Sequence, residues 1–474
     1  MSPDLAPRST DDDGGGGAPA NGRYPLAIAA ISMGTVLTIL DGQIAVVGLP
    51  TIARDLGVPG SSAVLVVTVY QLILVMTLLP FSALGSRIGL KTLYQGGQAV
   101  FTLATAACFF AHSLPMLLAV RALQSLGAAA ALSVTSAMVR TIYKPSHLGR
   151  GLALNTVFAT TASAAAPALG GAILSVASWP WLFATAVPFA LLSLLLGRLG
   201  LPAIPPRGRG YDTLGAVYCV VTFGLAISGM EAWVHGAPPL VAGAMLAAGL
   251  LLGLFFVRHE LGEAAPIMPV DLLRQPVIAL SGAGGLCAFV GSMLLLLSLP
   301  FRLQHGYGIG PGRTGAMIAA WPLTMMIVAP VSGALSDRIP AGVLGSIGMA
   351  IAIVALLFLA FLPAHPSYFS MAWRLALCGA GFGLFVSPNA RLIVGSAPRH
   401  RTASAGGLTS TIRLIGQTLG ATLLAALLAL GLGEGPVPAS IACLLAVIAG
   451  VLSLARLNPA LRRPDTAELE TGAA

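Results

Sequence analysis

Long apolar runs, separated by short stretches rich in proline, glycine and charge, fill the chain from Tyr24 onward. A run of about 20 residues spans a hydrocarbon core of roughly 30 Å as a helix, at about 1.5 Å per residue. The pattern therefore predicts an all-α polytopic membrane protein with fourteen transmembrane helices. The predicted spans are 24–49, 63–84, 93–111, 114–139, 151–176, 181–199, 213–233, 239–257, 277–300, 314–335, 342–362, 368–388, 403–432 and 437–455.

An internal repeat relates the first six spans to the last six. The segment PFSALGSRI at 80–88 reappears as PVSGALSDRI at 330–339, and RALQSLGAAAAL at 121–132 reappears as RLALCGAGFGLF at 374–385. A chance similarity of apolar segments is the alternative, but two blocks in register, each with a matching arginine, favour a true repeat. Repeated helical bundles are typical of secondary transporters, which carry a binding site near the midplane.

The repeat predicts an arrangement of 6+2+6 helices, because the spans at 213–233 and 239–257 have no counterpart. The N-terminal segment is rich in Gly, Asp, Ser and Pro, as disordered tails are, and it lacks the features of a signal peptide. The predicted organisation is a disordered cytoplasmic tail (1–23), an N-terminal six-helix bundle (24–200), a linker (201–212), two additional peripheral helices (213–257), a linker (258–276), a C-terminal six-helix bundle (277–457) and a cytoplasmic tail (458–474).

Composition supports the membrane prediction, since 56% of the residues are hydrophobic and 9% are charged, against about 25% charged in soluble domains. The net charge of +9 is spread over short loops with no basic face, so we expect no nucleic-acid partner. Most basic loop residues fall on one side of the membrane, and the other side has only Arg54, Arg302 and Arg313. The bias predicts a multi-pass protein of the bacterial inner membrane with both termini in the cytoplasm.

Asp41 is the only charged residue in the first predicted span, and an ionisable group in a membrane helix suggests function. It lies 17 residues after Tyr24, about 25 Å along the helix, while Arg121 lies about 9 Å into the fourth span from the opposite surface. Both thus occupy the outer half of the membrane at a similar depth. The alternatives are that Asp41 only pairs with a neighbouring helix and that Arg121 forms a fixed ion pair.

Glu231 is a second acid at a similar depth, 17 residues after Leu214. It is a candidate for the substrate cavity. A position at the membrane interface beside Trp233 and His235 is the alternative.

Two motifs carry a family resemblance. In LDGQIAVVGLPTI, Asp41, Leu49 and Pro50 fit a first-helix signature, with Val46 where an Asn is usual. In SALGSRIGLK, at 82–91, Arg87, Gly89 and Lys91 fit a gate motif between the second and third helices, although Ser82, Ser86 and Leu90 depart from it. The chain resembles the major facilitator superfamily, and within it the fourteen-helix drug:proton antiporter family.

The resemblance implies that the first and fourth spans line a central cavity, where Asp41 and Arg121 meet across water and Asp41 loads a proton on one side of the membrane and releases it on the other. It also implies roles for further residues. Arg121 and Gln124, in RALQSLG, are similar to a motif linked to proton coupling, and AAPALGG is similar to a motif that marks antiporters. The implied sites are proton coupling at Asp41 and Arg121; a substrate cavity with Asp41, Gln43, Gln124, Glu231 and Arg413; a cytoplasmic gate with Arg87, Gly89, Lys91, Asp337 and Arg338; and the antiporter motif residues Pro167, Gly170 and Gly171.

The resulting hypothesis is a proton-coupled exporter of amphipathic, often cationic, small molecules that works by alternating access. The alternative is an exporter of a neutral or anionic metabolite, for which Arg302, Arg374 or Arg413 supplies a positive site. A membrane enzyme is disfavoured because no DxD, HExxH or Ser-His-Asp arrangement is found that the predicted topology would bring together at the membrane interface. A channel is disfavoured because rings of pore-lining charge are nearly absent. We expect no cofactor, no metal, and a monomer.

Overall fold

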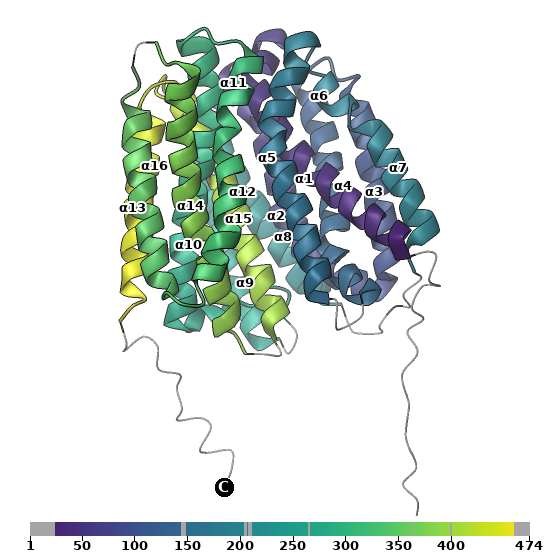
Figure 1. Cartoon of the computed structure of the whole chain (residues 1–474). Helices are drawn as coiled ribbons and strands as arrows, with labels where there is room; N and C mark the ends of the chain where they lie inside the picture. The colour runs from purple at the N-terminus through teal and green to yellow at the C-terminus, as the bar shows by residue number, and fades with distance from the viewer. Residues whose placement is uncertain are drawn as a thin grey trace, which may run out of the picture.

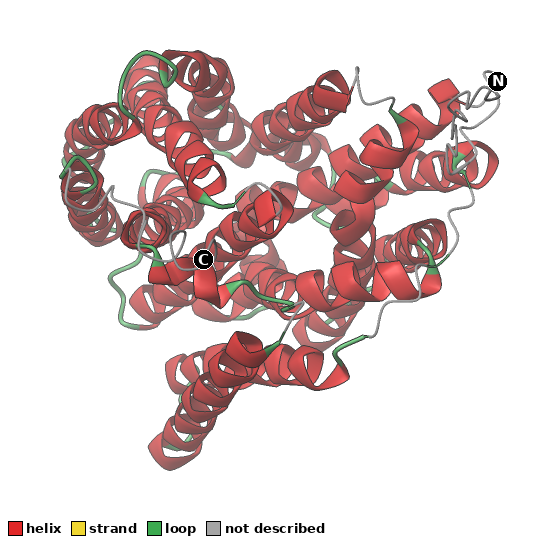
Figure 2. Cartoon of the chain, turned by 90° about the horizontal axis from the view of Figure 1, so that it is seen from below, coloured by secondary structure: helices red, strands yellow, loops and turns green. Residues whose placement is uncertain are grey.

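The computed structural model describes residues 24–143, 148–202, 206, 211–263, 266–363, 365–398 and 401–458, and it contains helices and loops but no strand within these ranges (Figure 2). The predicted tail at 1–23, the predicted tail at 458–474 apart from its first residue, and most of the linker at 201–212 lie outside the described residues. The all-α prediction is confirmed.

Each predicted span corresponds to one helix or to two consecutive helices. Two spans are divided, into α6 with α7 and into α11 with α12. The helices are α1 (Tyr24–Asp55), α2 (Gly60–Ile88), α3 (Leu90–Cys108), α4 (Leu114–Ile142), α5 (Leu148–Val176), α6 (Trp181–Ala184), α7 (Val187–Gly200), α8 (Thr213–Val234), α9 (Pro239–Gly262), η2 (Val270–Arg274), α10 (Pro276–Phe301), η3 (Arg302–Gly306), α11 (Pro311–Ile318), α12 (Ala320–Leu335), α13 (Ala341–Ala360), α14 (Tyr368–Ser396), α15 (Thr402–Ala429) and α16 (Val437–Ala455).

Thirteen helical segments in the described ranges are long and apolar enough to cross a membrane. The remaining span, α3, is less apolar because it contains Lys91, Gln95 and Gln98. Gln98 is fully buried, so its polar side chain contacts protein rather than lipid. With α3 included, the fourteen predicted spans are all present.

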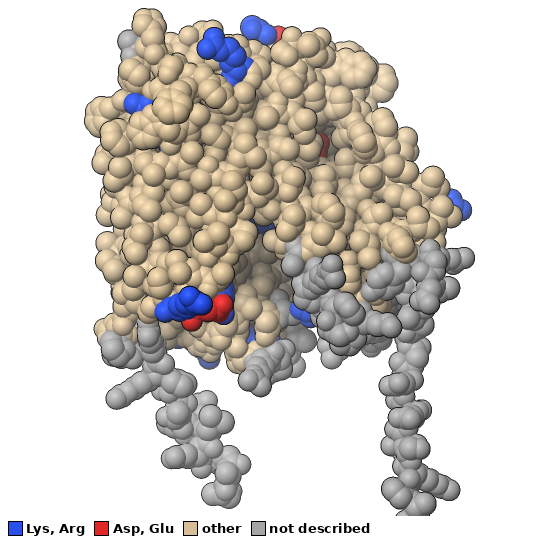
Figure 3. All heavy atoms as spheres, viewed as in Figure 1, with Lys and Arg blue, Asp and Glu red and all other residues tan. Residues whose placement is uncertain are grey.

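The helices α1–α7 and α10–α16 form two groups that stand side by side (Figure 1). Helix α1 begins, and α16 ends, at the lower end of this view, which we call the terminal face; the other end is the opposite face. Most of the visible charged side chains lie toward these two ends, and a broad band with few charges separates them (Figure 3). Such a band is what contact with lipid requires.

Helices α8 and α9 pack closely on each other through glycines. A side chain at Gly229 would meet the α9 backbone, since a Cβ there would lie 2.8 Å from the nitrogen of Leu246. Gly249 makes the reciprocal approach to Ala226. Of this pair, α8 also contacts α2 and α15, one helix from each group. The division into bundles at the stated boundaries stays a prediction.

Candidate functional site

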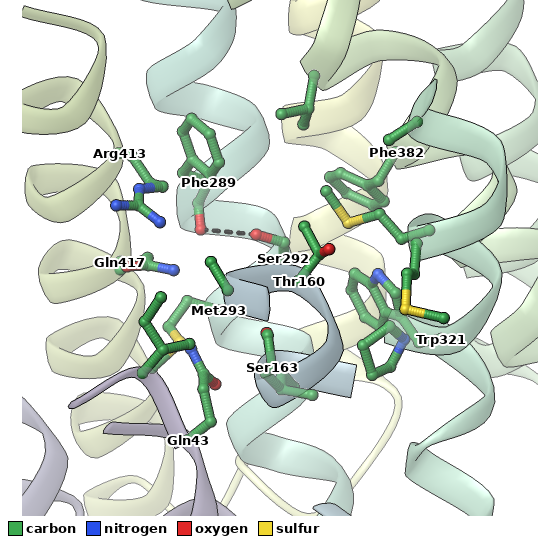
Figure 4. Close-up of a pocket in the computed structure, with 18 of the residues that line it drawn as sticks. Gln43, Thr160, Ser163, Phe289, Ser292, Met293, Trp321, Phe382, Arg413 and Gln417 are labelled. Atoms are coloured by element: carbon green, nitrogen blue, oxygen red, sulfur yellow. Dashed lines mark hydrogen bonds between the residues drawn. The ribbon is translucent and has the colours of Figure 1, made fainter. Parts of the chain in front are cut away.

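A cavity of about 290 Å³ lies between the two groups of helices, and α1, α5, α10, α12, α14 and α15 line it (Figure 4). Its wall is mainly apolar, with neutral polar groups and one arginine. The lining residues are Ile39, Gln43, Ala159, Thr160, Ser163, Pro167, Phe289, Ser292, Met293, Leu296, Trp321, Pro322, Met325, Met326, Ala329, Phe382, Val386, Arg413 and Gln417.

Asp41 and Arg121 form a direct ion pair next to this cavity. Nη1 of Arg121 donates to Oδ2 of Asp41 at 2.7 Å and to Oε1 of Gln124 at 2.7 Å. Nε2 of Gln124 donates to Oδ1 of Asp41 at 2.9 Å and to the Thr105 hydroxyl at 2.8 Å. The three side chains thus form a closed ring of hydrogen bonds between α1 and α4, and the bond to Thr105 connects the ring to α3. We call the ring the coupling cluster (Asp41, Arg121 and Gln124).

Aromatic rings and a backbone carbonyl complete the surroundings of Arg121. Its guanidinium carbon lies 4.3 Å from the ring centre of Tyr70 and 5.1 Å from that of Phe183. Its Nε donates to the carbonyl of Val66 at 3.3 Å. Arg121 is 0% exposed and Asp41 is 1% exposed, so the charges are compensated inside the protein rather than by solvent.

The sequence placed Asp41 and Arg121 at a similar depth, and the structure brings them together. The contact is direct, whereas the sequence argument expected the two to meet across water. Neither residue lines the cavity. Ile39 and Gln43 do, two positions before and after Asp41, because residues two apart project from nearly opposite sides of a helix.

The five candidate cavity residues therefore lie at three different places. Gln43 and Arg413 line the cavity, and Figure 4 shows both side chains. Asp41 and Gln124 lie in the coupling cluster. Glu231 lies elsewhere, between α8 and α15, where its Oε1 accepts a hydrogen bond from Thr422 at 2.5 Å. It is 8% exposed, and its Oε2 is 3.6 Å from the ring of His235.

Several cavity residues were missed at the level of sequence. Gln417 follows Arg413 by one helical turn, so the two share a face of α15. Trp321 and Met325 have the same spacing on α12, and the Trp321 ring lies 5.3 Å from that of Phe382. A stripe at this spacing is as common in an ordinary core, which is why the sequence alone did not single it out.

The residues of the predicted antiporter motif lie where α5 meets α1 and α11. A Cβ on Gly171 would lie 2.7 Å from the carbonyl oxygen of Pro311, and one on Gly170 would lie 2.9 Å from that of Ile44. Pro167 contacts Gly315 of α11 through its carbonyl. The motif thus permits backbone contact between helices from the two groups.

Other contacts close the cavity on the side of the opposite face. Gln304 of η3 donates to the carbonyl of Val47 at 3.0 Å. One apolar cluster contains residues of α1 and α10, among them Leu49 and Phe301. These contacts between the two groups of helices form the seal of the cavity on this side.

The terminal face is open by comparison. A cleft of about 840 Å³ lies there between α2 and α4 on one side and α14 and α15 on the other, with Ser86, Arg140 and Ser410 among its lining residues. Ser410 lies one turn before Arg413 on α15, so this cleft approaches the cavity from the terminal face.

The predicted gate residues also lie toward this face. Gly89 has φ 96°, a conformation that favours glycine, and it turns the chain between α2 and α3. Lys91 donates to the carbonyl of Leu201 at 2.6 Å, within its own group of helices. Asp337 forms its ion pair with Arg391 of α14 rather than with its neighbour Arg338. In the described ranges, neither Arg87 nor Arg338 forms an ion pair across the cleft.

A cavity between two groups of transmembrane helices, closed at one face and approached from the other, defines a membrane transporter. The model of the Major Facilitator Superfamily matches residues 31–421, and a further match covers 284–470. The chain belongs to the Major Facilitator Superfamily.

Relatives and solved structures agree with this assignment. The chain is 41% identical over 448 residues to the Escherichia coli protein named "Uncharacterized transporter YebQ", which covers 93% of this chain and 97% of that relative. It is 30% identical to "Multidrug resistance protein Stp" of Mycobacterium tuberculosis, over 85% of this chain and 76% of that protein. A crystal structure of a POT family transporter in complex with 5-aminolevulinic acid has the same fold, with a TM-score of 0.69, 15% identity and coverage of 93% and 96%.

Proposed function

We propose that this transporter is a proton-coupled exporter of small amphipathic molecules that works by alternating access. The observation that carries the proposal is the coupling cluster, a buried ion pair on helices α1 and α4, of which α1 also lines the cavity. A buried charge pair is costly to place in a membrane protein, and it is weak as a simple source of stability. A role in proton transfer would account for the presence of this buried ion pair.

Asp41 is the proposed proton carrier, because it is the one carboxylate in the cluster. A proton on Asp41 neutralises its charge and leaves the guanidinium of Arg121 buried without a counter-ion, which is unfavourable at low dielectric. Protonation therefore favours a rearrangement of α1 against α4. Since Ile39 and Gln43 of α1 line the cavity, a movement of α1 changes the part of the cavity wall that contacts the substrate.

The terminal face is proposed to be the cytoplasmic side of a bacterial inner membrane. Basic residues at helix ends support this orientation through the positive-inside rule, among them Arg87, Lys91, Arg140 and Arg198. On this assignment the structure is open to the cytoplasm and sealed to the outside. Two six-helix bundles, joined through α8 and α9, would then exchange this state for an outward-open one as a monomer.

Small amphipathic substrates are supported by the cavity wall and by a relative named for multidrug resistance. The sequence argument preferred cationic substrates. The described cavity wall favours the alternative of neutral or anionic substrates, because it contains no Asp or Glu and one Arg. Asp41, which was expected to offset a cationic substrate, is already bound to Arg121.

The test is transport by the purified protein in liposomes. A pH gradient of the correct sign is expected to drive accumulation of amphipathic probes, and a protonophore is expected to abolish it. A panel of anionic, neutral and cationic naphthalene derivatives covers the substrate classes. If an imposed pH gradient drives none of them, while exchange across the membrane proceeds without it, proton coupling is wrong.

A further inference from the structure

Arg413 presents an uncompensated charge to the central cavity. It lies 11 residues after Thr402, the first residue of α15, and 16 residues before Ala429, the last. These separations correspond to about 17 Å and about 24 Å along the helix, so Arg413 is well inside the membrane. Its side chain is exposed to the cavity, and within the described ranges it has no hydrogen bond and no ion pair.

Other interior arginines of this chain form hydrogen bonds within the protein. Arg121 binds Asp41 and Gln124. Arg302 donates to the carbonyls of Leu359 and Ala360, at 2.7 Å and 3.2 Å. Arg374 donates to the carbonyl of Ser370 at 2.6 Å, and Arg456 binds three polar side chains. The free guanidinium of Arg413 is therefore a property of its site and not of the fold in general.

No carboxylate is available to compensate Arg413 from the cavity wall. None of the 19 lining residues is Asp or Glu. The nearby membrane acids are engaged elsewhere, Asp41 with Arg121 and Glu231 with Thr422. A charged group in the membrane interior requires a partner or water, and an anion that enters this cavity meets a donor of five N–H groups.

The rest of the wall fits a flat apolar body. Figure 4 shows Arg413 and Gln417 on one side of the cavity and Trp321 and Phe382 on the other. Methionines 293, 325 and 326 provide adaptable apolar contacts between them. A molecule that spans the cavity would thus place a polar end at α15 and a ring against Trp321.

We propose that Arg413 is the recognition site for the anionic group of the transported molecule, and that the substrates are amphipathic organic anions with an aromatic body. This inference rests on the proposed transport function and narrows its substrate class. A carboxylate or sulfonate binds the guanidinium with charge-assisted hydrogen bonds, Gln43 and Gln417 supply further donors, and a cationic molecule of the same shape is repelled.

The experiment uses three probes of one shape: 2-naphthoate, 2-naphthamide and the 2-naphthylmethylammonium ion. Calorimetric titration of the purified full-length protein measures their dissociation constants. We expect 2-naphthoate to bind at least about tenfold more tightly than 2-naphthamide, the difference for one hydrogen bond to a charged group, and the cation to bind most weakly. Arg413→Gln should remove the preference for the anion, and Arg413→Lys should retain part of it.

The control for the substitution is Arg54→Gln, which removes an exposed arginine of the opposite face and should leave all three constants unchanged. A wild-type protein that prefers the cation, binds none of the probes at millimolar concentration, or keeps its preference in Arg413→Gln overturns the inference. The wild-type ratio tests it even if the variant does not fold.

The transport assay separates this inference from the proposed function. If the anion preference is present but a pH gradient drives no transport, the coupling is wrong and the Arg413 site stands. If a pH gradient drives transport of all three probes equally, the coupling stands and the site is wrong.

Discussion

Arg121 and Arg413 are two arginines inside the helical region whose surroundings differ completely. Arg121 is fully buried and meets a carboxylate, an amide and two aromatic rings. Arg413 faces a cavity and has no partner among the described residues. The difference teaches that an arginine in a membrane helix can be part of the protein's own charge balance or can be left for a ligand. The neighbours that the fold brings to it decide between the two.

The largest effect should come from breaking the charge balance at Arg121. Asp41→Asn leaves the guanidinium buried without its counter-ion, and we expect a loss of roughly 3–5 kcal/mol in the free energy of unfolding. Thermal unfolding in detergent measures it. The double variant Asp41→Asn/Arg121→Gln removes both charges and should recover most of the stability. If the single variant is as stable as the wild type, the pair is not buried as described.

Substitution of Gln124 tests whether all three residues of the coupling cluster contribute to its stability. Gln124→Ala removes hydrogen bonds to Asp41, Thr105 and Arg121, and we expect a loss of about 2–3 kcal/mol from polar groups left without partners. A double-mutant cycle with Thr105→Ala measures the share that belongs to the outer hydrogen bond. Additive losses for the two substitutions would show that Gln124 and Thr105 act independently.

Gly171 tests the contact between α5 and α11, which joins the two groups of helices and closes the cavity that Arg413 faces. A Cβ at Gly171 would lie 2.7 Å from the Pro311 carbonyl, so Gly171→Ala should weaken the seal by about 1–3 kcal/mol. Labelling of Ser292→Cys by an impermeant thiol reagent added outside, in a variant without the native cysteines, should accelerate.

The matched control is Gly243→Ala on α9, where nothing lies within 4 Å of the added Cβ. Its labelling rate should equal that of the parent. Equal rates for Gly171→Ala and Gly243→Ala would show that the α5–α11 contact does not hold the cavity closed.

The smallest effect on stability is expected at Arg413. Because its guanidinium has no hydrogen bond or ion pair to lose within the described ranges, Arg413→Gln should change the free energy of unfolding by less than about 0.5 kcal/mol, as surface substitutions do. Thermal unfolding beside Arg121→Gln gives the direct comparison. A large loss for Arg413→Gln would mean that the protein itself compensates this charge.

Most of the fold could be predicted from the sequence. Apolar runs of membrane-spanning length are set by local composition, so all fourteen spans were found. Errors lie at breaks within spans, as between α11 and α12, since packing decides where such a helix is interrupted. Counting residues along the spans placed Asp41 and Arg121 at a similar depth, and the direct contact between them comes from the structure.

The side-chain partners could not be predicted, because they depend on how helices rotate about their axes. Asp41 and Gln43 are two residues apart, yet one faces α4 and the other faces the cavity. The charge of the cavity depends on the same rotations. The sequence analysis assigned Asp41, Glu231 and Arg413 to the substrate cavity, and of these three only Arg413 lines it.

The central claim is that Asp41 couples a proton to transport, and its most direct test compares two assays on one variant. In liposomes, wild-type protein should catalyse both the exchange of labelled 2-naphthoate for unlabelled 2-naphthoate and its accumulation driven by a pH gradient. Asp41→Asn/Arg121→Gln, with both charges removed, should retain exchange and lose gradient-driven accumulation. If that variant still accumulates the probe in response to the pH gradient, Asp41 does not carry the proton.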